Sequence, residues 1–336
     1  MNVAAAEKPA MAMAGDRAQA QKLEVTIARY MAEAKDVMLL ELRDARGRAL
    51  PAFEPGAHVE VSLPNGLTRQ YSLLNDCRET DRYVLAVGRA ADSRGGSACV
   101  HESLTQGAPL QISAPRNNFP LDTAAQSYLF IAGGIGITPI MSMIRWCVAN
   151  QRPWRLVYAA RNRQRAALYE EIQLLGGERV QWHFDDEQGG YLQVAEFVQN
   201  LAEGEQIYCC GPQALMEAVQ DTAATHPPGV AHFEWFSAPK TDAPPAAAGT
   251  FEIRLERSGL SFSVPPDKSI LEVLEENGFS LPFSCREGTC RTCETGVCAG
   301  SPEHFDYVLS SEERAAGKSM MICVSRSVDP VLCLDL

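Results

Sequence analysis

Hydrophobic and polar positions alternate over short stretches in the N-terminal third of the chain. Val59, Val61 and Leu63 occupy every second position ahead of the turn residues 64–66, and residues 83–87 form another β-rich run. Alternation with a period of two, bounded by turn residues, is typical of strands that bury one face. The pattern therefore predicts a small antiparallel barrel.

From residue 127 the pattern changes to apolar strands that alternate with helices. We expect strands at residues 128–132, 156–160 and 206–210, with a helix over residues 140–146 after the first of them. Strands that alternate with helices form parallel sheets. This part of the chain is therefore predicted to be an α/β domain.

A third pattern begins after residue 249. Residues 251–255 and 260–264 are predicted to form a β-hairpin. Ser269 and Glu272 have the spacing of a capping box, which would open a helix that ends at Gly278. The C-terminal module is therefore predicted to contain both a hairpin and a helix.

Length and linkers divide the chain into parts. At 336 residues the chain exceeds what one hydrophobic core usually organises, and the stretch that holds Pro239, Pro244, Pro245 and three consecutive alanines favours an extended spacer. The predicted parts are a disordered extension (1–22), the barrel (23–122), the parallel-sheet domain (123–237), the linker (238–249) and the C-terminal module (250–336).

Composition excludes some classes of protein. No run of eighteen apolar residues is present, so a membrane-spanning helix is not expected. The formal net charge is -12, which argues against nucleic acid as a partner because phosphate contacts need a basic face. The 11 cysteines form an odd count, and no export signal is apparent, so we expect a reducing, cytoplasmic environment without a disulfide framework.

Four of these cysteines have a distinctive spacing. Cys285-x4-Cys290-x2-Cys293, followed 30 residues later by Cys323, is the ligand pattern of plant-type 2Fe-2S clusters. Gly288 would let the loop turn its N–H groups toward the sulfurs. A zinc site is the alternative, but structural zinc sites favour paired Cys-x2-Cys knuckles and only one pair is present.

Cys298 and Cys333 fall outside this ligand spacing. Cys298 is expected to be a small buried residue.

A glycine-rich turn follows the first predicted strand of the α/β domain. Gly133, Gly134 and Gly136 would let the backbone approach a pyrophosphate, and Thr138 with Pro139 is predicted to start the next helix as N-cap and N1. A purely structural strand-to-helix turn is the alternative.

A second turn of this kind supports the nucleotide interpretation. Cys210, Gly211 and Pro212 follow another predicted strand, and two turns at the carboxyl ends of one sheet form a crevice. We expect Cys210 to position a nicotinamide there.

Two motifs in the barrel suit a flavin. Arg69, Tyr71 and Ser72 offer a guanidinium for a phosphate, a ring to stack on isoalloxazine and a donor near N5. The loop Arg94, Gly95, Gly96 and Ser97 precedes a short helical stretch and could hold a phosphate. Each motif by itself is weak, and their order ahead of the nicotinamide crevice and the cluster supports the inference.

From about Leu23 to Leu336 the chain resembles the phthalate dioxygenase reductase family, which includes vanillate demethylase reductases. The motifs above, together with residues 208–213 and 232–236, occur in the family's order. The resemblance implies a multidomain fold: an antiparallel Greek-key β-barrel for FMN, an α/β parallel-sheet domain for NAD(H) and an α+β β-grasp ferredoxin domain.

The resemblance also implies roles for residues. Arg69 and Ser97 would hold the FMN phosphate, Tyr71 would pack on the flavin and Ser72 would approach its N5. Thr138 and Cys210 would flank the nicotinamide, and Phe236 would cover a flavin face.

One departure concerns the nucleotide. Where the family often has an acidic residue, Arg161-Asn162-Arg163 stands here, with Arg165 beyond, and arginines could accept the 2′-phosphate of NADPH. We still expect NADH.

The implied function is a reductase component that passes electrons from NADH through FMN and the 2Fe-2S cluster to a terminal oxygenase, typically of Rieske type. A reductase for a haem monooxygenase is one alternative. A zinc-knuckle interaction protein and an NADH-responsive redox sensor are others.

Overall fold

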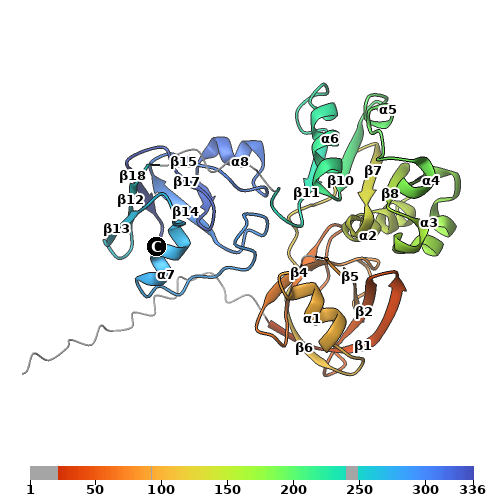
Figure 1. Ribbon diagram of the computed structural model, residues 1–336, viewed down its shortest axis with the longest axis horizontal. Coiled ribbons are helices and arrows are strands. Elements are labelled where there is room, and N and C mark those ends of the chain that lie inside the picture. Colours follow the sequence, from red (N-terminus) through yellow and green to blue (C-terminus); the bar gives the residue numbers. More distant parts are fainter. Residues whose placement is uncertain (1–21, 92, 240–248) are drawn as a thin grey trace, which may run out of the picture. The chain divides into compact units, whose positions relative to one another are not determined.

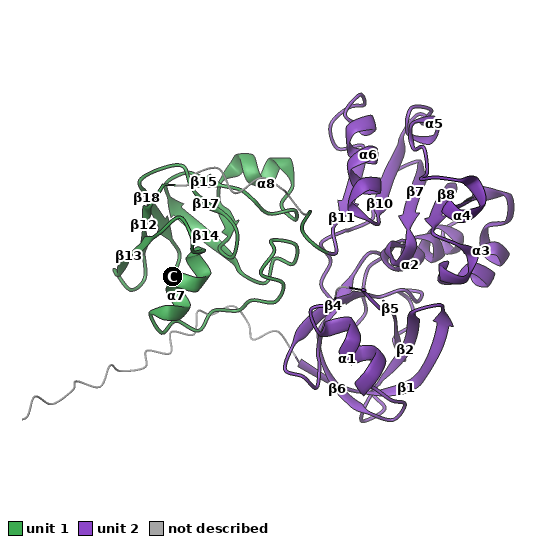
Figure 2. Ribbon diagram, viewed as in Figure 1, with its two compact units in different colours: residues 1–19, 237–336 green, residues 20–236 purple. Residues whose placement is uncertain are grey.

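The computed structural model describes residues 22–91, 93–239 and 249–336. The chain divides into two compact units, one covering residues 20–236 and the other beginning at Ser237 and ending at Leu336 (Figures 1 and 2). The predicted N-terminal extension lies outside the described residues apart from Lys22, which begins the first strand. Most of the predicted linker, residues 240–248, also lies outside them.

Six antiparallel strands form the barrel sheet of the first unit, in the order β4-β3-β6-β1-β2-β5. The strands are β1 (Lys22–Ala34), β2 (Val37–Asp44), β3 (His58–Ser62), β4 (Thr68–Ser72), β5 (Tyr83–Gly88) and β6 (Pro109–Ser113), and the short helix is α1 (Gly96–Ser103). The predicted barrel is confirmed. Its core contains Val59 and Val61, the residues whose alternation indicated a strand.

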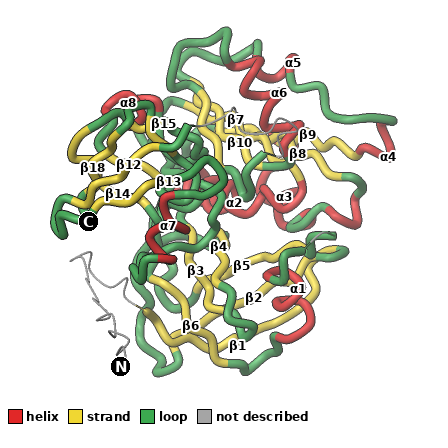
Figure 3. Tube along the Cα trace, turned by 60° about the vertical axis from the view of Figure 1, so that its left-hand side comes forward, coloured by secondary structure: helices red, strands yellow, loops and turns green. Residues whose placement is uncertain are grey.

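A five-stranded parallel sheet, β11-β10-β7-β8-β9, forms the rest of this unit and alternates with helices (Figure 3). The strands are β7 (Ser127–Gly133), β8 (Trp154–Ala160), β9 (Val180–Phe184), β10 (Glu205–Cys210) and β11 (Ala231–Glu234). The helices are α2 (Ile137–Ala149), α3 (Tyr169–Gly176), α4 (Asp185–Gln188), α5 (Ala195–Val198) and α6 (Gln213–Ala223), with 3-10 turns at Gly134–Gly136, Arg163–Arg165 and Gly177–Arg179.

The barrel and the parallel sheet share one hydrophobic core. Leu74 and Val84 of the barrel belong to the same buried cluster as Ile140 of α2. Across the same boundary the Arg145 guanidinium donates to the Leu74 carbonyl at 3.0 Å. The two sheets are therefore held in a fixed relation, so residues from both can build a single site.

The second unit is a mixed sheet, β13-β12-β18-β14-β16, packed against one helix. Its strands are β12 (Phe251–Leu255), β13 (Ser261–Val264), β14 (Glu294–Ala299), β15 (Pro302–Glu303), β16 (Ser319–Met321), β17 (Arg326–Ser327) and β18 (Val331–Leu334), and its helices are α7 (Ile270–Glu276) and α8 (Ser311–Ala316). The predicted hairpin is β12–β13, and Ser269 and Glu272 form the predicted capping box.

Within the described part of the chain, no helix is both long enough and apolar enough to cross a membrane.

Candidate functional site

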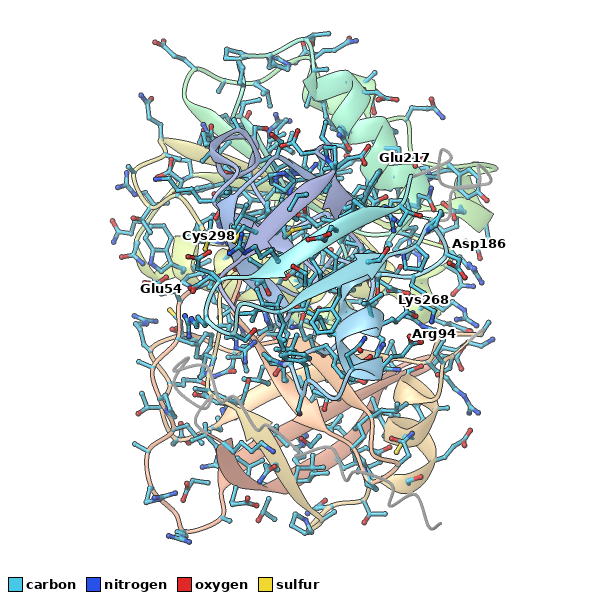
Figure 4. All side chains as sticks on the ribbon, turned by 90° about the vertical axis from the view of Figure 1, so that its left-hand side faces the viewer. Glu54, Arg94, Asp186, Glu217, Lys268 and Cys298 are labelled. Atoms are coloured by element: carbon cyan, nitrogen blue, oxygen red, sulfur yellow. The ribbon has the colours of Figure 1, made fainter. Side chains whose placement is uncertain are left out.

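Arg69 on β4 lies against the N-terminus of α1. Its guanidinium donates to the Arg94 carbonyl at 3.3 Å, and a Cβ on Gly96 would lie 2.8 Å from its Cγ. The helix starts after Gly95, which has a φ of 86° and leaves the N-terminus without a side-chain cap. A guanidinium beside uncapped backbone N–H groups is suited to a phosphate dianion, so these residues fit the phosphate of a flavin mononucleotide. Arg94 is labelled in Figure 4.

Two further predicted flavin residues of the barrel, Ser97 and Tyr71, are partly buried. The Ser97 hydroxyl donates to Ser93 Oγ at 3.0 Å and accepts from the Ala90 N–H at 3.2 Å, so the loop before α1 holds it in place. Tyr71 packs against the barrel core, and burial raises the pKa of its phenol to about 12. The ring is therefore held partly buried at the edge of the barrel core.

The two glycine turns meet at the carboxyl ends of neighbouring strands. Ala132 of β7 pairs with Cys210 of β10, and a Cβ on Gly136 would lie 2.2 Å from the Cys210 carbonyl oxygen. A Cβ on Gly133 would likewise lie 2.4 Å from Cδ of Pro212. The glycines thus permit a backbone approach that any larger residue would prevent.

The start of α2 differs from the sequence prediction. The helix begins at Ile137 with Gly136 as its N-cap, and the Thr138 hydroxyl donates to the Ile135 carbonyl at 3.0 Å. The prediction of Thr138 as N-cap and Pro139 as N1 was therefore wrong. A 3-10 turn over Gly134–Gly136 leads directly into the helix and moves its start toward the glycines.

Glu234, which sequence reasoning missed, lies beside Ser72 and Cys210. The Ser72 hydroxyl interacts with its carboxyl group, while its Oε2 is buried and has no hydrogen-bond partner among the described residues. Burial raises the pKa of Glu234 to about 8. The sequence offered one signal for this buried acid, because Glu234 stands between two aromatic residues in the run His232-Phe-Glu-Trp-Phe236.

Cys210 has a buried thiol at this same point. Burial is the main cause that raises the pKa of this thiol well above its ordinary value, and Glu234 adds to it once its own carboxyl group has ionised. The thiol therefore stays protonated, which suits a group that positions a ring and not a nucleophile.

The arginine-rich loop after β8 is largely neutralised by neighbouring acids. Arg163 pairs with Glu187 at 2.7 Å, and Arg165 pairs with Asp36 at 2.6 Å. Arg161 is exposed and makes no ion pair with any residue that the structure describes. Two of the three arginines are therefore already paired.

The four cysteines with cluster spacing come together in the second unit. Cys290 and Cys323 donate toward Cys285 and lower the pKa of its thiol, and Cys323 contacts Cys293 in the same way. Three of the four, Cys290, Cys293 and Cys323, are buried. The set offers four sulfur ligands in one place, as a 2Fe-2S cluster needs.

The loop around these cysteines is shaped to donate hydrogen bonds to sulfur. The N–H groups of Glu287 and Thr289 point to Cys285 Sγ at 3.3 and 3.4 Å. Gly288 between them has a φ of 73°, and a Cβ there would lie 2.9 Å from Cα of Asp306. The predicted turn at Gly288 is confirmed, and the loop fits a cluster whose sulfurs accept N–H bonds.

Comparisons with known proteins match these sites. A 2Fe-2S iron-sulfur cluster binding domain matches residues 253–328, and an oxidoreductase NAD-binding domain matches residues 130–221. The chain is 44% identical over 304 residues to phenoxybenzoate dioxygenase subunit beta of Ectopseudomonas oleovorans, covering 90% of this chain and 94% of that one.

Phthalate dioxygenase reductase of Burkholderia cepacia is 40% identical over 322 residues, with 94% of this chain and 97% of that one covered. A solved phthalate dioxygenase reductase matches with a TM-score of 0.69 at 41% identity over 94% of this chain and 98% of that one. The chain belongs to the phthalate dioxygenase reductase family.

Members of this family combine three cofactors, and the chain is accordingly an oxidoreductase that uses FMN, NADH and a 2Fe-2S cluster. Membership of this family implies that the chain has an oxygenase as its partner.

A similar chain also forms part of a larger enzyme. An intact type IV self-sufficient cytochrome P450 monooxygenase matches with a TM-score of 0.88 at 35% identity, over 94% of this chain and 41% of that one.

Two residues named in the sequence analysis, Phe236 and Cys298, are exposed. Phe236, expected over a flavin face, is 47% exposed at the end of the first unit. Cys298 is exposed, so the expectation of a buried residue was wrong. A β-bulge in β14 places it outside the core, which a period-two reading of the strand could not show.

Proposed function

We propose that this reductase takes a hydride from NADH onto FMN and passes the electrons singly through its 2Fe-2S cluster to a terminal Rieske-type oxygenase acting on an aromatic or similar small substrate. The similarity to phthalate dioxygenase reductase along almost the whole chain carries this proposal. When bound, NADH supplies two electrons together, FMN accepts them and releases them singly, and the cluster carries one.

At the flavin site, Arg69, Ser97 and the amides of Arg94, Gly95 and Gly96 would hold the FMN phosphate. The contact of Arg69 with the first turn of α1 supports this assignment. Tyr71 would pack on the ring system, and Ser72 would lie near its N5.

At the proposed nicotinamide site, two glycine turns would line the crevice: Gly133, Gly134 and Gly136 form one, and Gly211 with Pro212 forms the other. The nicotinamide would be surrounded by Thr138, Pro139 and Cys210. The direct contact between the two turns supports this arrangement. Phe236 would cover a flavin face. Cys285, Cys290, Cys293 and Cys323 would hold the cluster.

The domain boundaries 1–22, 23–122, 123–237, 238–249 and 250–336 remain our proposal. We also place the protein in the cytoplasm, because its free thiols suit a reducing compartment.

NADH is the proposed donor. Glu187 and Asp36 already neutralise Arg163 and Arg165, which leaves Arg161 alone to meet a 2′-phosphate.

Anaerobic titration of the holoprotein with NADH and with NADPH tests the proposal. The expected result is bleaching of the flavin together with a rhombic signal from the reduced cluster in electron paramagnetic resonance, at lower concentrations of NADH than of NADPH. Failure of either signal to appear with NADH would refute the proposed order of carriers.

A haem monooxygenase is the second candidate partner, favoured by the similarity to a self-sufficient P450. The two candidates are separated by reconstitution with purified oxygenases in the presence of NADH. Reduction of a Rieske oxygenase supports the first proposal, and reduction of a P450 haem with no transfer to a Rieske centre supports the second.

A further inference from the structure

Two cysteines outside the cluster set, Cys298 and Cys333, lie on neighbouring strands where the pairing contains a β-bulge. In the pairing of β14 with β18, Val297 is opposite Leu334 and Ala299 is opposite Cys333, so Cys298 is the extra residue of a bulge. At such a bulge two residues of one strand face a single residue of the other. Cys298 and Ala299 therefore both face Cys333.

The spacing of such strands suits a cross-link. Directly opposed residues of antiparallel strands, here Ala299 and Cys333, have Cα atoms about 4.5–5.5 Å apart. The bulge brings Cys298 to face Cys333 as well, and the Cys298 sulfur is close enough to affect the Cys333 thiol, so the pair suits the range of about 4.4–6.8 Å between Cα atoms that disulfides occupy. Both cysteines are free thiols, Cys298 is exposed and Cys333 is partly exposed. An oxidant in solution can therefore reach Cys298.

The surroundings of Cys333 add a second, independent feature. Its thiol donates to the Glu256 carboxylate at 3.1 Å. Burial and Glu256 raise the pKa of Cys333 to about 11, and the Cys298 sulfur is close enough to add to this effect. Glu256 is thus placed to take the Cys333 proton when its sulfur reacts.

We propose that Cys298 and Cys333 form a reversible intramolecular disulfide when the protein meets hydrogen peroxide. The Cys298 thiolate attacks one peroxide oxygen, the O–O bond breaks, and a sulfenic acid and hydroxide form. The Cys333 sulfur then attacks the sulfenic sulfur, an S–S bond replaces the S–O bond, and water leaves. The Cys333 proton passes through Glu256 to the hydroxide that leaves the sulfenic sulfur, and the proton that Cys298 released on forming its thiolate neutralises the hydroxide from the peroxide, so two thiols and one peroxide give one disulfide and two waters.

The disulfide would connect two strands of the ferredoxin unit without using any proposed ligand. β14 begins directly after the ligand Cys293, but the bulge lies at the opposite end of the strand. Cross-linking closes the chain between Cys298 and Cys333, which restricts the unfolded state of this unit. Oxidation is therefore expected to raise the midpoint of its thermal unfolding and to leave NADH oxidation with artificial acceptors unchanged.

Peroxide treatment of the full-length holoprotein, followed by alkylation and peptide mapping by mass spectrometry, tests the proposal. The expected product is a peptide pair joined through Cys298 and Cys333 that has lost two hydrogen atoms and is restored by a dithiol. Cys298→Ser and Cys333→Ser should each abolish it, while Cys77→Ser, which changes a partly buried thiol of the barrel, should leave it intact.

Three results would overturn the proposal. One is recovery of Cys298 and Cys333 as separately oxidised residues, and another is a disulfide formed only between chains. A third is a cross-link that appears only after the cluster absorption has been lost, because the sulfurs would then pair in damaged protein.

Discussion

At the scale of single residues, Glu234 has unusual electrostatics beside the proposed nicotinamide site. Its Oε2 is buried without a partner, and the Ser72 hydroxyl and the Cys210 thiol are its neighbours. With a pKa of about 8, most Glu234 carboxyls are protonated at pH 7. A neutral acid thus lies next to Ser72 and Cys210, the two residues proposed to face the flavin and the nicotinamide.

Glu234 is predicted to make the first unit less stable as the pH rises. Its folded pKa is raised from the ordinary 4.5 to about 8, so folding favours the protonated form. The stability it contributes is complete below pH 4.5 and is lost as the pH rises through 8, by at most about 5 kcal/mol. Denaturant unfolding between pH 5 and 8 should show a shallower pH dependence in Glu234→Gln than in wild type.

The exposed Glu203 provides the control, because Glu203→Gln removes a carboxylate of the same unit without a buried environment. The Glu203→Gln profile should match wild type. Equal pH slopes for Glu234→Gln and wild type would show that Glu234 is ionised in the folded protein.

Arg69→Gln is predicted to weaken FMN binding. A hydrogen bond to a charged group contributes about 1.5–3 kcal/mol, so the loss should be roughly 10- to 100-fold in affinity. Equilibrium dialysis of the flavin measures it. Arg46→Gln, which removes an exposed arginine from another loop of the barrel, is the matched control. Unchanged FMN affinity in Arg69→Gln would place the phosphate elsewhere.

At the scale of elements, loops and turns decide where chemistry occurs, and glycines decide the shape of these turns. Gly133 and Gly136 allow two strand-to-helix turns to touch, and Gly288 bends the loop that carries three of the cluster cysteines. Each is required by a close contact, a positive φ or both. A single methyl group at such a position should therefore affect one site and spare the others.

Gly288→Ala is predicted to reduce the cluster content. The new Cβ would lie 2.9 Å from Cα of Asp306 and 2.7 Å from Cγ2 of Val324, in a backbone conformation that costs about 1–3 kcal/mol for alanine. Iron and sulfide analysis should show a large loss of cluster, while the flavin of the other unit stays bound.

Gly259→Ala separates local strain from collision. Gly259 lies in the β12–β13 hairpin of the same unit with a φ of 68°, but a Cβ there would meet nothing within 4 Å. It should retain the cluster with a small loss of stability. Equal cluster loss in both variants would mean that backbone strain alone, and not the contact with Asp306, decides cluster assembly.

At the scale of the whole molecule, charge is distributed unevenly. From residue 250 onward, 8 Lys and Arg stand against 14 Asp and Glu, a balance of -6 within a total of -12. A negative surface favours association with a basic patch and speeds encounter at low ionic strength. We therefore propose that the ferredoxin unit docks on a basic patch of the acceptor.

Raising the ionic strength is predicted to slow electron transfer to the oxygenase. The Debye length falls from about 10 Å at 0.1 M to about 3 Å at 1 M salt, which screens attraction between separated charges. NADH oxidation with ferricyanide should change much less, because it needs no protein docking. A transfer rate to the oxygenase that stays constant across this range would contradict docking by charge.

Much of the fold and of the cofactor set could be predicted from sequence because the signals are local. Alternation at Val59 and Val61, the capping box at Ser269 and the spacing of Cys285, Cys290 and Cys293 each depend on residues close together in the chain. Because the backbone allows only a few structures for residues spaced in these ways, the patterns indicated the barrel, the helix and the cluster loop.

Tertiary structure alone decided the features that join distant segments. Glu234 lies beside Ser72, although 162 positions of the sequence separate them. Arg165 forms an ion pair with Asp36. A β-bulge places Cys298 outside the core, facing Cys333. A sequence pattern records which side chains exist and how they are spaced, whereas pKa, charge pairing and exposure depend on what the folded chain brings beside them. The motifs of this reductase therefore indicated its chemistry, whereas the protonation state of Glu234 and the exposure of Cys298 depend on how the folded chain packs.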